Sequence, residues 1–228
     1  MAHLASCFSC LEMIYALYMM DILRFDHDNP KWEERDRFIL SKGHAGLALY
    51  SVLLSAGLIS EDDFSSYLHE DSVFGGEPCM RDCEWIEATT GSLGHGLSLG
   101  LGMAIALKSD CRDSKVYVML GDGECQEGSV WETAMMAPAH RLGNLIAILD
   151  CNRIQKMDFV DKIMGNIDWR DKWEAFGWVV DEVDGHNIEE FKKVIEKQTD
   201  PDKPRLIIGH TVKGKGVSIM ENNPNWHF

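Results

Sequence analysis

The C-terminal half of the chain alternates short apolar runs with segments of helical spacing. Strand-like runs occupy residues 115–120, 145–150, 178–183 and 205–210, and helical patterns occupy 129–141, 169–176 and 188–198. Strands that alternate with helices of this length predict right-handed βαβ units and a mostly parallel sheet. The runs at 116–120 and 145–149 are continuously apolar, as expected for strands buried on both faces. We therefore expect a doubly wound α/β fold.

The N-terminal third has a different pattern. Helices are predicted at 4–23 and 46–56, a glycine-rich loop at 75–76, and a segment rich in Gly, Ser and Ala at 89–108. Acidic residues interrupt the apolar segment 4–23, which also lacks a basic flank and a cleavage-like site, so we interpret it as a buried helix and not a membrane span. No repeat, low-complexity tract or linker divides the 228 residues, and one domain over 1–228 is expected.

Charge and cysteine content narrow the possible ligands and partners. A formal net charge of −15 disfavours nucleic acid, so an anionic ligand needs helix N-termini, backbone N–H groups or a metal. The odd number of cysteines, 7, argues against a secreted disulfide framework and favours a reducing cytoplasm. The pairs Cys7/Cys10 and Cys79/Cys83 could combine in a zinc site, but neither has a matching histidine pair, and this is the less favoured alternative.

Oxygen-bearing groups follow two consecutive predicted strands. The first strand leads into Gly121-Asp-Gly, whose glycines permit a tight turn and a close approach of the backbone to an anion. The next strand leads to Asn152 and Ile154, beyond the carboxyl end where open α/β sheets bind ligands. A lone Gly-Asp-Gly is more often a plain turn. The carboxylate of Asp122, the amide oxygen of Asn152 and the carbonyl of Ile154 together indicate a Mg²⁺ site that serves a phosphate ligand.

The spacing and the amino-acid sequence of these motifs resemble those of a known family. Gly121-Asp-Gly, followed by 28 residues (124 to 151) and then Asn152, resembles the thiamine diphosphate motif. Other segments resemble transketolases, particularly the separate N-terminal subunits of split transketolases: LSKGHAGLALY, EATTGSLGHGLSLGLGMAIALK, GDGECQEGSVWETAMMA, NLIAILDCNRIQ, FGWVVDEVDGH and HTVKGKGVSIMENNPNWH. The resemblance extends over nearly the whole chain. It implies a thiamine diphosphate-binding fold, the diphosphate-binding (PP-type) domain.

The resemblance assigns roles to individual residues. It implies that Asp122, Asn152 and the Ile154 carbonyl bind Mg²⁺ under the diphosphate of thiamine diphosphate. It also implies that Gly91 and Leu93 of GSLG contact the aminopyrimidine and thiazolium rings.

Three histidines and a glutamate complete the implied site. His44 and His227 resemble histidines near the diphosphate and the reacting carbons, and His3 matches a third active-site histidine. Glu127 resembles the acidic residue that links paired active sites across the subunit interface. From the residues alone, His44 could equally cap a helix, and Glu127 could favour a helix dipole from the first turn.

Other residues near these motifs have simpler interpretations. Trp131 and the pair Met135-Met136 have helical spacing on an apolar face and are expected in the core. Lys213 and Lys215 are either a solvated loop or a guide for a sugar phosphate.

The sequence departs from the transketolase pattern in three places. Gly76-Glu77-Pro78 stands where transketolases carry Gly-His-Pro, and a glutamate accepts hydrogen bonds and repels a phosphate or carboxylate. The chain also begins about one helix later than its relatives and stops at Phe228, where they continue. These departures bear on the substrate and leave the expected fold unchanged.

The resemblance implies a transketolase-like transferase. Thiamine diphosphate and Mg²⁺ would supply the carbanion chemistry that moves a two-carbon ketol unit from a ketose or ketose phosphate to an acceptor, and histidines would move protons. A separate C-terminal, pyrimidine-binding subunit is the expected partner, in an α2β2 assembly without nucleic acid or membrane. Two alternatives are transfer to a lipoyl or thiol carrier, and a non-catalytic regulatory or scaffolding subunit. The second alternative has no need of Asp122 with Asn152.

Overall fold

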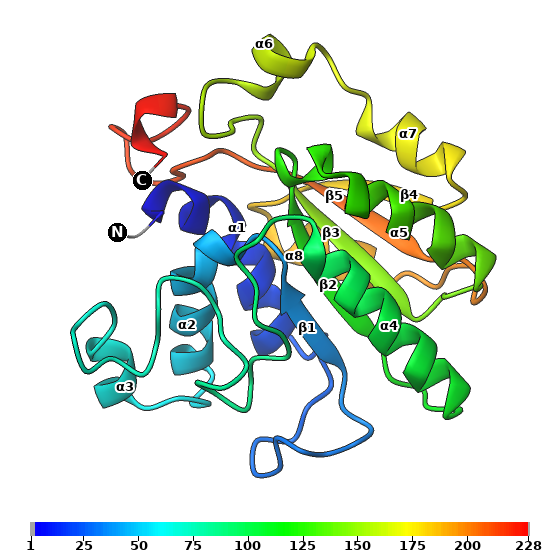
Figure 1. The fold of residues 1–228 in the computed structure, drawn as a ribbon, viewed down its shortest axis with the longest axis horizontal. Helices are drawn as coiled ribbons and strands as arrows, with labels where there is room; N and C mark the ends of the chain where they lie inside the picture. The colour runs from blue at the N-terminus through cyan, green and yellow to red at the C-terminus, as the bar shows by residue number, and fades with distance from the viewer. Residues whose placement is uncertain (1–2, 228) are drawn as a thin grey trace.

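A five-stranded parallel sheet forms the centre of the protein in a computed structural model that describes residues 3–227 (Figure 1). The strand order is β1-β2-β3-β5-β4, and every neighbouring pair is parallel. Because all strands run in one direction, their carboxyl ends gather at one edge, where a ligand can reach the loops that follow them. The strands are β1 (Arg37–Leu40), β2 (Val116–Gly121), β3 (Leu145–Cys151), β4 (Val179–Asp184) and β5 (Arg205–His210).

Helices cover both faces of the sheet. On one face pack α1 (Leu4–Met19), α2 (Gly46–Ser55) and α8 (Ile188–Ile195), and on the other pack α4 (His95–Ser109), α5 (Gly128–Ala139) and α7 (Trp169–Ala175) (Figure 1). Alternate residues of β2 enter the two cores: Tyr117 and Met119 contact the first set of helices, and Val118 and Leu120 the second. Both faces are therefore buried, which explains the continuous apolar runs and confirms the doubly wound α/β expectation.

Shorter elements connect these layers. The segment between α2 and α4 leaves the sheet and closes over its own small cluster of Tyr50, Phe74 and Ile86. A backbone hydrogen bond of 3.0 Å from the N–H of Thr90 to the carbonyl of Pro78 holds the glycine-rich loop beside the residues that lead into α4. Glu77 of this loop lines the same cavity as Gly121 at the end of β2. The short elements are α3 (Glu61–Ser65), α6 (Val160–Met164) and the 3₁₀ turns Gly43–Ala45, Glu124–Gln126 and Pro224–Trp226.

Most predicted elements are confirmed to within a few residues, but β1, α3 and α6 were not predicted, and the segment that contains α4 was described only by its Gly, Ser and Ala content. The helix expected over 4–23 ends at Met19, because Asp21 adopts a left-handed conformation with φ of 58°. The strand β1 was missed because its four residues follow a charged stretch and are too few to show a period. The five-residue helices α3 and α6 were missed for the same reason of length.

Two expectations about side chains have different outcomes. Trp131 packs against the core, with its ring centroid 5.5 Å from that of Trp173. The prediction that Met135 and Met136 lie in the core is wrong, since they are 55% and 46% exposed. On α5 the buried positions are Val130, Thr133, Ala134 and Ala137, so the two methionines lie on the outer side of the helix.

No helix among residues 3–227 is long and apolar enough to cross a membrane. The apolar segment 4–23, interpreted from the sequence as a buried helix, contains a 16-residue helix with ten buried residues, packed between α2 and α8. Met1, Ala2 and Phe228 lie outside the described residues.

Candidate active site

One cavity of about 410 Å³ brings together every site residue predicted from the sequence. This volume lies within the range of small-molecule and cofactor sites. The residues come from the loops after β1, β2 and β3, from the loop before α4, and from the two ends of the described chain. The predicted residues that line it are His3, His44, Gly91, Leu93, Gly121, Asp122, Gly123, Glu127, Asn152, Ile154 and His227.

Asp122 connects the ends of β2 and β3. Its Oδ1 accepts a hydrogen bond from the N–H of Gly123 at 2.8 Å, and its Oδ2 accepts one from the N–H of Arg153 at 2.6 Å. The side chain is buried, and burial together with the nearby Asp150 raises the pKa of Asp122 to about 6. Two hydrogen bonds use half of the acceptor positions of a carboxylate, so Asp122 retains lone pairs for a cation.

The other two expected metal ligands lie on the next strand end. Asn152 Oδ1 accepts a hydrogen bond of 3.1 Å from the N–H of Ile154. Between them, Arg153 has a left-handed φ of 63°, which turns the chain sharply after β3. A carboxylate, an amide oxygen and a carbonyl are the hard oxygen donors that Mg²⁺ prefers, with phosphate oxygens or water completing its shell. The residues present therefore fit a magnesium diphosphate.

A zinc site is not formed by the cysteines. The described part of the chain contains no group of three or more His, Cys, Asp or Glu residues arranged to hold a metal. All seven cysteines are free thiols, and Cys10 Sγ donates to the Ser6 and Cys7 carbonyls within α1. Burial raises the pKa of both Cys7 and Cys10, which keeps these thiols protonated.

Lys213 lies inside the cavity, whereas Lys215 does not. The Nζ of Lys213 donates to the Ile154 carbonyl at 3.0 Å and to Nδ1 of His227 at 2.9 Å. Burial, with a contribution from Lys42, lowers the pKa of Lys213 to about 8. Lys215 is exposed and lines a separate hollow. Of the two interpretations made from the sequence, the solvated loop suits Lys215, and Lys213 supplies a cation where a diphosphate would need one.

Three histidine rings surround the same space. The His3 ring centroid lies 5.3 Å from that of His44 and 5.5 Å from that of His227, and the last two are 6.2 Å apart. Burial, followed by the charge of Lys42, lowers the pKa of His44 to about 2. Burial and Lys213 lower the pKa of His227 to about 3, and the same causes lower that of His3. All three rings are therefore neutral near pH 7, and each can accept one hydrogen bond and donate another.

His44 does not cap a helix. Ala45 is the N-cap of α2 and Lys42 that of the preceding 3₁₀ turn, and neither end has a side-chain capping bond. The structure thus removes the alternative that the sequence left open for His44. Glu127 likewise is not on the first turn of α5: it is the N-cap residue, with an extended backbone and no side-chain capping bond. Its position before the helix, against Gly94, leaves the carboxylate at the cavity.

Glu77 occupies part of the cavity wall. A Cβ added to Gly91 would lie 2.6 Å from the Glu77 Cδ, so the carboxylate packs directly on the GSLG segment. Gly91 has a φ of 140°, which few other residues adopt. Glu77, which stands where the transketolase pattern has a histidine, is thus part of the site.

Glu124 is a buried carboxylate that sequence analysis missed. It accepts hydrogen bonds from the N–H of Gly94 at 2.9 Å, from the N–H of Gly121 at 3.1 Å, and from the Ser41 hydroxyl. Burial raises the pKa of Glu124. These bonds tie together the GSLG, GDG and SKGH segments. A glutamate two residues after Asp122 gives no sign of burial in the sequence, because its partners are distant along the chain.

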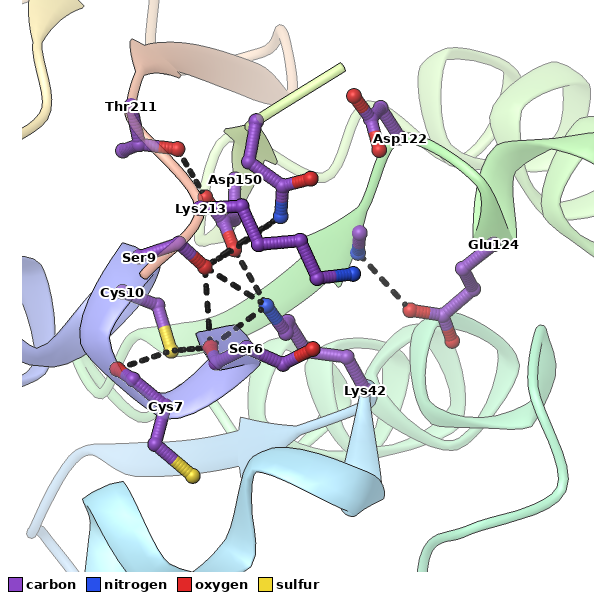
Figure 2. A network of polar contacts seen from close by, with 12 residues as sticks. Ser6, Cys7, Ser9, Cys10, Lys42, Asp122, Glu124, Asp150, Thr211 and Lys213 are labelled. Carbon is purple, nitrogen blue, oxygen red and sulfur yellow. Dashed lines mark hydrogen bonds and ion pairs between the residues drawn. The ribbon is translucent and has the colours of Figure 1, made fainter. Parts of the chain in front are cut away.

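A second buried network was also missed (Figure 2). Lys42, two residues after β1, forms an ion pair with Asp150 on β3, and both side chains are almost completely buried. Burial opposes both charges, but the attraction between them dominates: Asp150 raises the pKa of Lys42, and Lys42 lowers that of Asp150. Ser9 on α1 and Thr211 after β5 also donate to Asp150. The signal in the sequence was a lysine and an aspartate inside otherwise apolar or glycine-rich motifs.

Comparison with known proteins agrees with this geometry. Residues 2–227 match the family described as "Transketolase, thiamine diphosphate binding domain". The chain is 44% identical over 226 residues to one of the subunits of the apulose-4-phosphate transketolase of Phocaeicola vulgatus, covering 99% of this chain and 80% of that protein. It is 39% identical over 220 residues to the 6-deoxy-6-sulfo-D-fructose transketolase subunit SqwG of a Clostridium species, covering 96% of this chain and 80% of that protein.

Solved structures show the same relationship. The crystal structure of transketolase from Campylobacter jejuni superimposes with a TM-score of 0.85 at 30% identity, covering 99% of this chain and 39% of that chain. The chain thus spans about two fifths of that full-length transketolase. The expected family and the expected fold class are both confirmed. The chain belongs to the transketolase family of ketol-transferring enzymes, as a subunit that carries the thiamine diphosphate-binding domain.

Proposed function

We propose that this chain binds thiamine diphosphate together with Mg²⁺ and forms the diphosphate-binding half of a split transketolase. The observation that carries the proposal is the convergence of the Asp122, Asn152 and Ile154 oxygens on a cavity lined by three neutral histidines. When bound, thiamine diphosphate supplies the carbanion chemistry by which a two-carbon ketol unit passes from a ketose or ketose phosphate to an acceptor.

The chain's own residues would bind the cofactor at both ends. Asp122, Asn152 and the Ile154 carbonyl would hold the Mg²⁺, and Lys213 would balance the charge of the diphosphate. Gly121 and Gly123 permit close approach of the backbone to the phosphates. The GSLG segment, with Gly91 and Leu93, would contact the rings, and Glu124 fixes that segment to the end of β2.

The histidines would move protons to and from the substrate. Lys213 donates to Nδ1 of His227, so Nε2 of that ring carries the proton and can donate it to a substrate oxygen. His3 and His44 lie beside it and are neutral near pH 7, so each has a ring nitrogen that can accept a hydrogen bond from a substrate hydroxyl group. Because their pKa values are lowered, the three histidines contribute hydrogen bonds and not positive charge at this end of the cavity.

Sugars are the favoured substrates. Two related subunits are named for apulose 4-phosphate and for a sulfofructose, and both are transketolases. These names favour a sugar donor and acceptor over a lipoyl or thiol carrier. Asp122, Asn152 and Ile154, the proposed metal ligands, all line the cavity, and a non-catalytic scaffolding role would not require them.

The proposed enzyme is assembled from two kinds of subunit. The related proteins are named as subunits, which supports a partner for this chain. We propose that the partner is a pyrimidine-binding subunit, that two copies of each chain associate, and that Glu127 lies where paired sites meet. A reducing cytoplasm is the proposed location, supported by the odd number of cysteines.

The proposal is tested by calorimetry and by a transfer assay. The purified chain, mixed with its partner subunit, should bind thiamine diphosphate when Mg²⁺ is present and not when the metal is chelated. The same complex should transfer a ketol unit from a ketose phosphate to an aldose. A complex that is folded but does not bind thiamine diphosphate with Mg²⁺ would refute the proposal.

A further inference from the structure

Asp150 is the centre of a buried hydrogen-bond network (Figure 2), which also includes Asn152, one of the expected metal ligands. Its Oδ2 accepts from the Ser9 hydroxyl at 2.6 Å and from Nδ2 of Asn152 at 3.1 Å, and it also accepts from Lys42. Its Oδ1 accepts from the Thr211 hydroxyl. Four segments of the chain thus meet at one carboxylate that does not itself line the cavity.

The ion pair with Lys42 keeps the Asp150 carboxylate ionised, so this carboxylate can accept hydrogen bonds but cannot donate one. The ammonium group of Lys42 pairs with Asp150 and donates further to the Ser6 carbonyl at 3.2 Å, so neither charge is left unpaired in the interior. An ionised carboxylate accepts hydrogen bonds but has none to donate. Any group packed against Oδ2 must therefore present a donor.

The donor presented by Asn152 is its amide nitrogen. Nδ2 of Asn152 faces Asp150 and, at 3.3 Å, the Ser9 hydroxyl, while Oδ1 accepts from the Ile154 N–H. The oxygen and nitrogen of a carboxamide have nearly the same size, so sterics alone do not decide which way the amide points. A reversed amide would place an oxygen against the Asp150 carboxylate and an NH₂ group against the Ile154 N–H. The network therefore selects one orientation.

We propose that Asp150 is a positioning residue which, held by Lys42, Ser9 and Thr211, keeps the Asn152 carboxamide with its oxygen toward the metal site. This inference rests on the proposed function, because it concerns the ligand that the metal would meet. An amide NH₂ group has no lone pair available for Mg²⁺, so a loss of orientation becomes a loss of metal affinity. Groups that orient a metal ligand typically change affinity by about 10- to 100-fold when removed.

Ser9 offers the mildest test, with a matched control on the same helix. Ser9→Ala removes a hydroxyl that contacts both Asp150 and Asn152 but keeps the Lys42–Asp150 ion pair. Ser6→Ala removes an equally buried hydroxyl one turn earlier, for which no hydrogen-bond partner exists among the described residues. The Kd for Mn²⁺ is measured by electron paramagnetic resonance in the presence of thiamine diphosphate, with the partner subunit bound. Ser9→Ala should raise this Kd by about tenfold, and Ser6→Ala should leave it unchanged.

A double-mutant cycle separates positioning from a general effect on structure. If Ser9 acts through Asn152, then adding Ser9→Ala to Asn152→Ala should weaken Mn²⁺ binding no further. Thr211→Val provides a second variant, which loosens Asp150 without touching Asn152 and should give a smaller loss. Additive effects of Ser9→Ala and Asn152→Ala, or an unchanged Kd in both Ser9→Ala and Thr211→Val, would overturn the inference. If the unmodified protein and Ser6→Ala both fail to bind thiamine diphosphate, the proposed function fails, and this inference fails with it.

Discussion

The Oδ2 of Asp122 accepts a hydrogen bond of 2.6 Å from the backbone N–H of Arg153, although the two residues are 31 positions apart. The contact follows from the register of the sheet, in which Gly121 on β2 lies opposite Asp150 on β3. Neighbouring parallel strands end level with each other, so the residues that follow them meet. The fixed spacing between Gly121-Asp-Gly and Asn152 is therefore the length of one helix and one strand that return the chain to the same edge.

Replacing Asp122 tests the metal site. Asp122→Ala should weaken Mg²⁺-dependent binding of thiamine diphosphate by more than about 100-fold, since even groups that only orient a ligand change metal affinity by 10- to 100-fold. The fold should stay intact, because Asp122 lies in the turn after β2 and belongs to neither hydrophobic core. Calorimetric titration gives the affinity and urea unfolding gives the stability. An unchanged cofactor affinity in a folded variant would show that Asp122 does not bind the metal.

The sheet could be predicted from the sequence because its strands are buried on both faces. A run such as Val116 to Leu120 must then be apolar at every position, and this signal is local. The motifs around Asp122 and Asn152 could also be recognised from local sequence, because each motif follows such an apolar run. The strand β1 has only four residues, and its role depends on pairing with β2 across nearly 80 intervening positions, which no local pattern reveals.

The buried charges could not be predicted for a related reason. Lys42 and Asp150 are 108 positions apart, and Glu124 reaches its partners only after three loops have folded together. Lys42 and Asp150 differ from surface charges only by standing inside apolar or glycine-rich motifs, and only the tertiary structure supplies the partner of each residue. The prediction that Met135 is buried was wrong for a different reason. An apolar residue on a helix is buried only when it lies on the face of the helix that packs against the sheet, and Met135 lies on the outer face of α5.

Glu77 should influence which donor is accepted. Its carboxylate packs on Gly91 in the cavity wall, where it can accept but not donate and where it disfavours an anionic substrate. Glu77→His should raise kcat/KM for ketose phosphates severalfold relative to uncharged ketoses. The matched control is Glu84→His, because Glu84 is exposed, pairs with Lys31 at 2.8 Å and does not line the cavity. An unchanged preference between the two donor types would place position 77 outside the donor-binding region.

His44 should make the protein less stable in mild acid. Its pKa falls from 6.5 to about 2 on folding, because of burial and the nearby charges of Lys42 and Lys213. Below its unfolded pKa, the unfolded chain therefore binds a proton that the folded chain does not, and the free energy of unfolding decreases as the pH falls. Between about pH 7.5 and pH 5, His44 should account for a loss of up to about 2 kcal/mol.

The variant His44→Gln should accordingly lose less stability than the unmodified chain over this pH interval. Urea unfolding at both pH values gives the difference, and comparing differences removes the constant effect of the substitution itself. The control is His140→Gln at the end of α5, outside the cavity. If His44→Gln and the unmodified chain lose the same stability on acidification, His44 is not held neutral by its surroundings.

The chain should require a second polypeptide for activity. Residues 3–227 contain one five-stranded sheet, and the full-length transketolase of C. jejuni is matched over 39% of its length. The resemblance to transketolases implies that a glutamate on a separate pyrimidine-binding domain hydrogen-bonds the cofactor ring and promotes formation of the reactive carbanion. Loss of one such charge-assisted bond costs roughly 1.5–3 kcal/mol, or about ten- to a hundredfold in affinity, and catalysis depends on it further.

Turnover with Mg²⁺, thiamine diphosphate and a ketose phosphate should therefore appear only when the partner subunit is added to the purified chain. The expected activity of the chain alone is below about 1% of that of the complex, in line with the lost contact. Asp122→Ala, mixed with the same partner, serves as the control: it should remain inactive, which shows that turnover in the complex depends on the cavity of this chain. Because each site would be shared between subunits, activity should rise to a plateau at a one-to-one ratio of the two chains. Robust turnover by the purified chain without a partner would contradict the two-subunit assembly and would require that the carbanion-promoting group be found among its own residues.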